Sequence, residues 1–488
     1  MKKLFTFILG MGAMLCANAQ APYAYDLSYD AANYNVQFKS TGDAPLANLI
    51  LTKVSDGTKT TLSLGSITKG SNSFYLGALE IGELEKTAYN WAVQVNGNAI
   101  AEAKRVHLSE LTTKTDTKNR DVRGGVAFVR DTESEAFGKS VVSVGLSQGL
   151  WVMSPTFEKE GTYHTNKFST TNRSSSFRIC ENEGIIYVQD WSDAYSGIWT
   201  FDPISKSLGN FFEGTRGTGG AFTNSNGEII GGGGTSVDIV GEGENRCMYS
   251  FQEDYPTGNG GNLLVRYDIG TAKTWGKVPD KNYGLQNMDN TNVEVLATEN
   301  GVFISQIRYT SNAAANSKGC PAFKYLSKDG TVLFNSGSDM TDLKGSGSGM
   351  AINDDGTLFA FSEGANGINI YSLSWSNNVP AFEKLYNIPN SAAAEVNQLD
   401  FDIAGNLHAF IGGLGYAVFE LPQDAPTATT PAKKASMITI DSTVSVKGIN
   451  VDADAPVEYY NLQGVKVENP EKGIFIKCQG SKTTKVVL

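Results

Sequence analysis

The sequence predicts an all-β protein whose central part is a β-propeller of about six blades. Composition is the first observation, because 53 glycines, 24 phenylalanines and 20 tyrosines stand beside only 19% charged residues. This balance is typical of many short strands joined by tight turns. The second observation is an internal repeat between residues 121 and 422, and the third is that no long stretch has helical periodicity.

The repeat is clearest in two segments, residues 149–155 (GLWVMSP) and 197–203 (GIWTFDP). Two strand-like runs precede most copies and a fourth run follows most of them. Four strands in about 40 to 50 residues indicate a propeller blade. The turns at 353–356 and 404–406 resemble those of propellers with NHL-like repeats. Weaker copies begin at residues 264, 322, 368 and 416.

The sixth copy has no evident fourth strand after Leu421. A ring that is closed by both ends of the chain leaves no exposed sheet edge. We therefore expect the stretch just before residue 121 to supply the missing strand.

Two further β-regions flank the predicted propeller, which we place at residues 111–422. Residues 20–110 alternate apolar and polar side chains, as in 34–38 and 89–95, and this period of two predicts an immunoglobulin-like β-sandwich. Residues 423–435 are rich in proline and threonine and are interpreted as a linker. Residues 436–488 then form a small C-terminal β-domain.

The N-terminus indicates export. Lys2 and Lys3 precede an apolar run from Leu4 to Cys16, and small residues follow it. This order fits a secretory signal peptide over residues 1–19. No later segment approaches the roughly 18 apolar residues of a membrane helix, so we expect a protein that does not span the membrane and that lies outside the cell or on its outer surface.

The last part of the chain contains YYNLQG at 459–464, GIFIK at 473–477 and a terminal KVVL. It closely resembles the C-terminal sorting domain of secreted and surface proteins of the Bacteroidetes. The resemblance covers residues 436–488 and implies export across the outer membrane by the type IX system. The alternative is a small β-domain with a packing role only.

The net charge and the cysteine content limit the classes of partner and cofactor that we expect. The formal net charge of −11 would repel a phosphate backbone, so nucleic acid is not an expected partner. Four cysteines follow the predicted signal, and their spacing fits no zinc pattern. We expect neither a metal nor a cofactor, and we consider a disulfide between Cys247 and Cys320, in loops of adjacent blades.

The candidate binding residues lie in loops that we expect to converge on one face of the propeller. We predict that residues 231–262 form the longest of these loops. Aromatic side chains beside carboxylates and arginines suit carbohydrate recognition, although the same aromatic residues would also serve to pack the loops. The candidates are Asp190, Trp191, Asp193, Tyr195, Arg246, Tyr255, Arg308 and Tyr309.

The three histidines give little indication of catalysis. His408 is interpreted as a core or rim residue, and His164 is the one we would test as a general base. No HExxH or complete phosphate-loop motif is present. The leading hypothesis is therefore non-catalytic binding of a glycan or a surface protein. The alternatives are a polysaccharide-active enzyme, a hydrolase or lyase with a site assembled from several blades, and a purely structural role.

Overall fold

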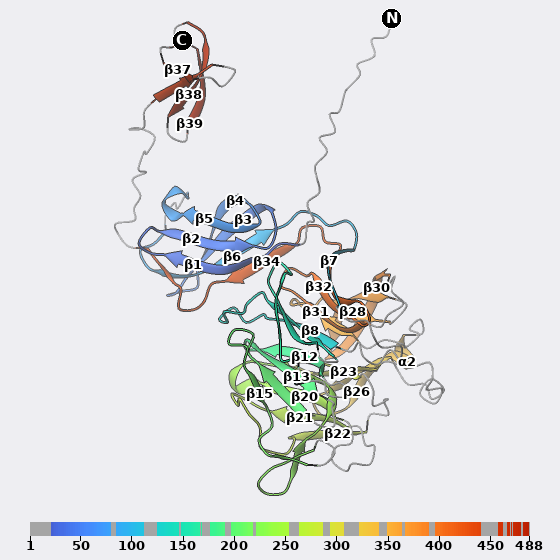
Figure 1. Cartoon of the computed structure of the whole chain (residues 1–488). Helices are drawn as coiled ribbons and strands as arrows, with labels where there is room; N and C mark the ends of the chain where they lie inside the picture. The colour runs from blue at the N-terminus through green and yellow to red at the C-terminus, as the bar shows by residue number, and fades with distance from the viewer. Residues whose placement is uncertain are drawn as a thin grey trace, which may run out of the picture.

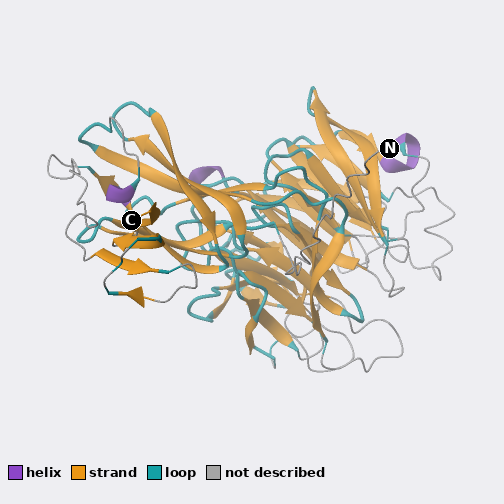
Figure 2. Ribbon diagram, turned by 90° about the horizontal axis from the view of Figure 1, so that it is seen from above, coloured by secondary structure: helices purple, strands orange, loops and turns teal. Residues whose placement is uncertain are grey.

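The computed structural model is all-β, with strands as its dominant elements (Figure 2), and the arrangement of its sheets is propeller-like. It describes residues 21–79, 84–111, 124–145, 148–165, 167, 176–190, 197–217, 221–252, 263–285, 293–306, 322–340, 349–363, 367–389, 396–440, 457–461, 466–468, 470, 472–479 and 482–487. Helical structure within these ranges is limited to η1 (Leu76–Ala78), η3 (Gly243–Asn245) and α2 (Ser336–Asp339). None of these helices is long and apolar enough to cross a membrane.

The body below the sandwich in Figure 1 contains a series of four-stranded antiparallel sheets. The first is β8 (Gly124–Phe128), β9 (Ser140–Val144), β10 (Gly149–Met153) and β11 (Lys159–Tyr163), and the second is β12 (Ser176–Asn182), β13 (Ile185–Asp190), β14 (Gly197–Phe201) and β15 (Leu208–Asn210). The third is β19 (Gly234–Val240), β20 (Cys247–Gln252), β21 (Leu263–Asp268) and β22 (Lys281–Leu285), and the fourth is β23 (Val293–Thr298), β24 (Gly301–Gln306), β25 (Phe323–Ser327) and β26 (Val332–Asn335). The fifth is β27 (Met350–Ile352), β28 (Leu358–Ser362), β29 (Ile368–Ser376) and β30 (Val379–Ile388). The sixth is β31 (Val396–Phe401), β32 (Leu407–Ile411), β33 (Gly415–Glu420) and β7 (Lys104–Glu110).

The first strands of these sheets contact one another in cyclic order. The order is β8, β12, β19, β23, β27 and β31, and β31 contacts β8 again. An apolar core lies between each sheet and the next. Leu150 and Ile186 share one such core, and Trp151 and Tyr416 share another. Burial of these interlocking side chains stabilises the cycle.

All six repeated segments of the sequence are third strands of these sheets. The glycine at the head of the repeat has a steric cause. Gly149 and Gly415 have positive φ angles of 69° and 134°. A Cβ atom at either position would lie 2.2 Å from the carbonyl oxygen of Tyr163 or 2.1 Å from that of Ser109, both on the fourth strand. Only glycine allows the two backbones to approach so closely.

The expected closure of the last sheet is confirmed. Strand β7 pairs with β33 from Gly415 opposite Glu110 to Glu420 opposite Lys104. This pairing corrects the predicted domain limit, because residues 104–110 belong to the last sheet of the ring and not to the sandwich. The alternating pattern of β7 would suit the sandwich or the last sheet of the ring. Strand β7 joins the ring because the edge of β33 is free to pair with it.

An additional sheet lies between the second and third sheets in sequence. It consists of β16 (Thr215–Arg216), β17 (Phe222–Thr223) and β18 (Ile229–Gly231). Phe212 and Phe222 pack against each other with ring centres 5.5 Å apart. These rings join the core that the second and third sheets share, so the insertion extends an existing core.

The N-terminal region is a sandwich of two antiparallel sheets. One contains β1 (Ala24–Asp30), β2 (Asn35–Ser40) and β5 (Gly70–Tyr75). The other has the order β34 (Thr427–Pro431), β6 (Ala88–Asn96), β3 (Ala44–Lys53) and β4 (Lys59–Ile67), and β35 (Ile438–Thr439) also pairs with β6. Phe38, Leu49, Trp91 and Ile438 meet in its core.

Part of the predicted linker at 423–435 is a strand, because residues 427–431 form β34. This strand pairs with β6 from Thr427 opposite Asn96 to Pro431 opposite Ala92. Ala428 and Thr430 are buried, and the Thr430 hydroxyl donates to the carbonyl oxygen of Ala24 at 2.7 Å. The edge of β6 needs a partner, and a threonine-rich segment has the β-propensity to serve as one.

The sandwich and the ring share a small apolar core of their own. Tyr23 and Phe128 meet edge to face with ring centres 5.9 Å apart, together with Ala428. Asn406 forms hydrogen bonds with both the backbone nitrogen and the carbonyl oxygen of Ala21. The two bodies are therefore fixed to each other by buried contacts.

The C-terminal sheet lies beyond the sandwich in Figure 1. Its order is β37 (Lys466–Val467), β36 (Val457–Tyr460), β38 (Ile474–Gln479) and β39 (Lys482–Val487). Tyr459 and Tyr460 of the YYNLQG motif pair in β36 with Lys477 and Ile476. The segment resembling a sorting domain thus contributes strands to one sheet, while Ile438 and Thr439 belong to the sandwich.

Candidate functional site

A cavity of about 1150 Å³ lies at the centre of the ring. Residues of the first strands β8, β12, β19, β23, β27 and β31 line it. It opens where these strands turn into the second strands, since Glu183, Gly241 and Glu299 of those turns also line it. We call this cavity the funnel. Lys434, from the segment between β34 and β35, lies at its rim on the side of the sandwich.

Carboxylates of the funnel accept hydrogen bonds from backbone N–H groups of a neighbouring sheet. Asp238 accepts from Ala297 at 2.6 Å, and Glu294 accepts from Met350 at 2.8 Å. Asp400 accepts from Phe128 at 2.7 Å. The first strand of each sheet has an edge facing the funnel, and its N–H groups need acceptors once they are buried.

Neutral side chains complete the same pattern. The side-chain oxygen of Gln398 accepts from the backbone nitrogens of Val126 and Ile179, both at 3.1 Å. The hydroxyl of Ser236 accepts from the backbone nitrogen of Val295 at 2.9 Å. Polar side chains thus join neighbouring sheets around the funnel and hold its wall in place.

Burial changes the protonation of the deep acids. It raises the pKa of Asp238 to about 7, against hydrogen bonds from Ala297 and Ile239 that lower it. It also raises the pKa of Glu181 to about 7, although backbone N–H groups of Gly184 and Arg130 donate to this side chain. The pKa of Glu294 is raised by the same burial. Near neutral pH Asp238 and Glu181 can therefore hold or release a proton.

Arg130 is the cation inside the funnel. Its Nη2 lies 2.7 Å from Oδ1 of Asp400, and its Nε lies 2.9 Å from Oδ1 of Asp354. It also donates to the carbonyl oxygen of Phe401. The guanidinium therefore joins the first turn of the fifth sheet to strand β31 of the sixth and neutralises part of the buried negative charge.

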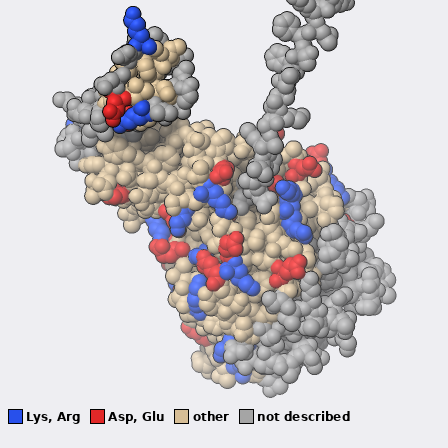
Figure 3. Space-filling view, turned by 45° about the horizontal axis from the view of Figure 1, so that its top comes forward, with Lys and Arg blue, Asp and Glu red and all other residues tan. Residues whose placement is uncertain are grey.

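The funnel as a whole is acidic. Nine carboxylate residues line it against the two cations Arg130 and Lys434, and its lining among the described residues includes no aromatic side chain. A concave surface with charge of one sign focuses the field on a ligand of the opposite sign. On the outer face in Figure 3, by contrast, acidic and basic side chains lie beside one another. The nine are Asp131, Glu133, Glu181, Glu183, Asp238, Glu242, Glu294, Glu299 and Asp400.

Asp190 and Arg246, the two predicted ligand-binding residues that the structure describes, do not line the funnel. Asp190 is the buried last residue of β13 and pairs with Ser176 at the start of β12. This is the end of the ring opposite to the mouth of the funnel, which lies beside Asn182 at the end of β12. Trp191, Asp193, Tyr195, Tyr255, Arg308 and Tyr309 lie outside the described residues.

The prediction of one long loop over residues 231–262 is wrong, because β19 and β20 occupy much of it. Arg246 lies just before β20 and is 1% exposed. Its Nε donates to Asn182 at 2.6 Å and its Nη2 to the hydroxyl of Tyr187 at 2.5 Å. Arg246 therefore connects two sheets, and it lies at the opposite end of β12 from Asp190. The structure does not bring these two candidates together.

The predicted disulfide between Cys247 and Cys320 stays a prediction, because only Cys247 lies within the described residues. It is a free thiol whose Sγ lies 3.1 Å from Oδ1 of Asp268, and burial raises its pKa to about 11. Cys320 lies outside the described residues. Cys180 is also a free thiol. In the described ranges no group of three or more His, Cys, Asp or Glu side chains is arranged to hold a metal ion.

Two histidines are held by structural hydrogen bonds. His164 Nε2 lies 2.8 Å from the carbonyl oxygen of Lys206 and must donate to it. His408 Nδ1 lies 3.0 Å from the Ser140 hydroxyl, and its Nε2 lies 3.4 Å from Asp402. This order resembles a nucleophilic triad, yet Ser140, His408 and Asp402 are each at most 1% exposed. His408 is a core residue, as the sequence predicted.

The sequence contained one signal for the funnel acids that the prediction missed. An acid stands between apolar residues in several first strands, as in Val237-Asp238-Ile239, Val293-Glu294-Val295 and Leu399-Asp400-Phe401. A charged residue that recurs at one place in a buried repeat indicates a shared structural environment.

Comparisons with known proteins show no family. No family model matches the chain, and no curated protein matches it. A protein of unknown function from Bacteroides thetaiotaomicron has 10% identity and a TM-score of 0.41, over 81% of this chain and 94% of that chain. The gluconolactonase XC5397 of Xanthomonas campestris has 12% identity and a TM-score of 0.40, over 67% and 97%. The RRP9 WD40 repeats have 10% identity and a TM-score of 0.39, over 67% and 99%.

Proposed function

We propose that this chain is an exported surface protein that binds a protein partner without catalysis, and that the funnel receives a basic segment of that partner. The central body is a six-bladed β-propeller, and the N-terminal sandwich is an immunoglobulin-like domain. The cyclic contacts of the first strands and the two-sheet core around Trp91 support these assignments.

One observation favours the binding of a protein segment over an enzymatic or a purely structural role. The deep carboxylates are held by backbone N–H groups, as with Asp238 on Ala297 and Glu294 on Met350. A rigid acidic wall presents fixed acceptors to lysine or arginine side chains. Such complementarity of charge raises the rate of association and the specificity of binding. Of the two ligand classes, the absence of aromatic side chains from the described lining favours a protein segment over a glycan.

Binding of a labelled oligolysine tests this proposal, with an oligoglutamate of equal length as the control peptide. We expect wild-type protein to bind oligolysine with an affinity that falls as salt rises. The double variant Glu242→Gln/Glu299→Gln removes two rim charges and should weaken binding roughly tenfold. Glu383→Gln changes an exposed residue of β30 and should have no effect. Equal binding of both peptides would contradict the proposal.

Glycan binding remains the proposal for the opposite end of the ring, where Asp190 begins the predicted loop site. A glycan array with Trp191→Ala and Tyr195→Ala tests it. Binding that is lost in these variants and kept in Glu242→Gln/Glu299→Gln would assign the glycan to that end.

An enzyme acting on polysaccharide is the second candidate, because Asp238 and Glu181 have pKa values of about 7 within a cavity. Such groups are suited to general acid and base catalysis. Release of reducing or unsaturated ends from polysaccharides would support it. Asp238→Asn and Glu181→Gln should then abolish that release while the protein stays folded.

Export and sorting are proposed from the first nineteen residues and from the tail. Fractionation of cells that produce the full chain, or the chain without residues 441–488, tests both. We expect the full chain at the cell surface or in the medium and the shortened chain in the periplasm. An equal distribution of the two would remove the sorting role of the tail.

A further inference from the structure

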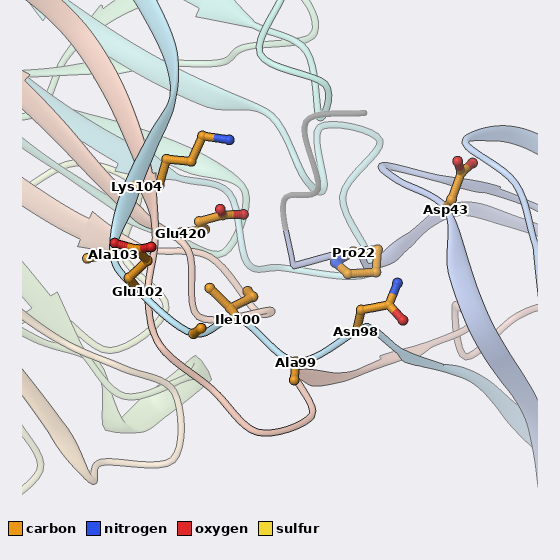
Figure 4. A pocket seen from close by; sticks show the side chains of 10 residues that line it. Pro22, Asp43, Asn98, Ala99, Ile100, Glu102, Ala103, Lys104 and Glu420 are labelled. Carbon is orange, nitrogen blue, oxygen red and sulfur yellow. The ribbon is translucent and has the colours of Figure 1, made fainter. Parts of the chain in front are cut away.

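A second cavity lies at the junction of the sandwich and the ring, away from the funnel. Its volume is about 390 Å³, within the range of sites for small molecules. Residues 98–104, which connect β6 to β7, form much of its wall, and Pro22, Asp43 and Glu420 complete it (Figure 4). We call it the junction cleft. It shares no lining residue with the funnel.

Glu420 is the unusual group of the junction cleft. The side chain is 7% exposed, and its Oε2 atom is buried without a hydrogen-bond partner among the described residues. Its carboxylate points toward the cleft in Figure 4. Burial raises the pKa of Glu420, and Lys104 opposes this rise. A buried acceptor that the protein leaves without a donor indicates a donor from outside the chain.

Lys104 does not meet this need in the structure. It stands opposite Glu420 in the pairing of β33 with β7. However, its side chain is exposed, and Oε2 of Glu420 has no hydrogen-bond partner among the described residues. The carboxylate therefore has a neighbouring positive charge but retains an unused oxygen.

The remaining wall defines the chemistry of a ligand. Asp43 and Glu102 add two carboxylates to Glu420, against the single cation Lys104. Pro22 and Ile100 supply apolar surface. A negative cleft with an apolar side and an acceptor lacking a donor fits a cation with an alkyl chain.

We propose that the junction cleft binds a small organic cation, whose primary ammonium or guanidinium group donates to Glu420 while its alkyl part lies against Pro22 and Ile100. The junction cleft would bind this cation whether or not a partner occupies the funnel, because the two cavities share no lining residue. It is built from the sandwich, the strand connection and the last sheet at once.

Isothermal titration calorimetry on the full chain tests the proposal with butylamine and butylguanidine, and with butanol as the uncharged probe of equal length. We expect both cations to bind and butanol not to bind. Glu420→Gln should weaken binding roughly tenfold because the neutral amide loses the charge attraction. Lys104→Gln should tighten binding severalfold because it removes a repelling charge.

Glu102→Gln is a second test variant in case Glu420→Gln does not fold. Glu102 is exposed, so this substitution should leave the fold intact, and it should weaken binding of the cations severalfold. Glu383→Gln is the matched control and should bind as wild type. Failure of both cations to bind wild-type protein, or equal affinity in Glu420→Gln and wild type, would overturn the proposal. The oligolysine experiment depends on Glu242 and Glu299, so the two proposals can fail separately.

Discussion

The Asp238 carboxylate accepts a hydrogen bond from the backbone nitrogen of Ala297 at 2.6 Å, across the boundary between the third and fourth sheets. Asp238→Ala removes this acceptor and leaves a buried N–H group without a partner. We expect a loss of roughly 1 to 3 kcal/mol in the free energy of unfolding. Asp238→Asn keeps an acceptor and should lose less. Denaturant titration of both variants measures this, and an equal loss in the two would contradict the role of the acceptor.

The stability of the protein should fall as pH rises between about 5 and 8. The pKa values of Asp238 and Glu181 are about 7 in the folded protein, above their ordinary values. The folded state therefore binds protons more tightly than the unfolded state in this range, and each group destabilises it above pH 7 by at most roughly 4 kcal/mol. His107, whose pKa is lowered by burial, has the opposite effect near pH 6.

The difference between wild type and Asp238→Asn isolates one acid from these other groups. We expect the melting temperature of the variant to fall less between pH 5 and 8. Parallel pH profiles of the two proteins would show that Asp238 titrates in the same way in the folded and unfolded states.

Arg130 should stabilise the ring through its geometry as well as its charge. Its guanidinium contacts both Asp400 and Asp354, and a lysine would retain the charge without the planar set of donors. We expect Arg130→Lys to cost about 1 kcal/mol and Arg130→Met about 2 to 3 kcal/mol. Urea unfolding measures both, and a lysine variant as unstable as the methionine variant would show that charge has no part in this effect.

The chain should need residues up to Ile440 for its sandwich, and none beyond them. A chain ending at 440 retains β34 and β35 on β6, whereas a chain ending at 426 exposes that edge together with Trp91 and the space left by Ile438. We expect the first to melt as the full chain does. The second should aggregate or lose the sandwich transition in calorimetry. Equal behaviour of the two shortened chains would contradict the assignment of β34.

Cys247 should behave as a free but unreactive thiol. Burial and the neighbouring Asp268 carboxylate raise its pKa to about 11, so little thiolate exists at pH 8. We expect slow alkylation by iodoacetamide in the folded protein and fast alkylation after unfolding without reductant. Cys247→Ser should change stability little. If the unfolded protein resisted alkylation at Cys247 until reduced, this cysteine would be in a disulfide.

The loop candidates remain predictions, because most of them lie outside the described residues. Asp190 and Arg246 show why sequence alone could not select among them. Both are polar residues near predicted turns, but β12 separates them by its full length. Which end of a strand a turn occupies depends on the direction of each strand in the ring. Where two strands are mistaken for one loop, as in residues 231–262, the turns that follow are assigned to the wrong end of the ring.

The sequence by itself determined the all-β class and the six third strands. Period-two alternation and the glycine before a strand, as at Gly149, act over a few residues, so they are visible in one dimension. Tertiary structure decided the rest. Strand β34 meets β6 more than 300 residues away in sequence, and the carboxylates of Asp238, Glu294 and Asp400 gain their role from N–H groups on neighbouring sheets. Those pairings depend on which edges remain free once the ring has closed, and that is a property of the whole fold.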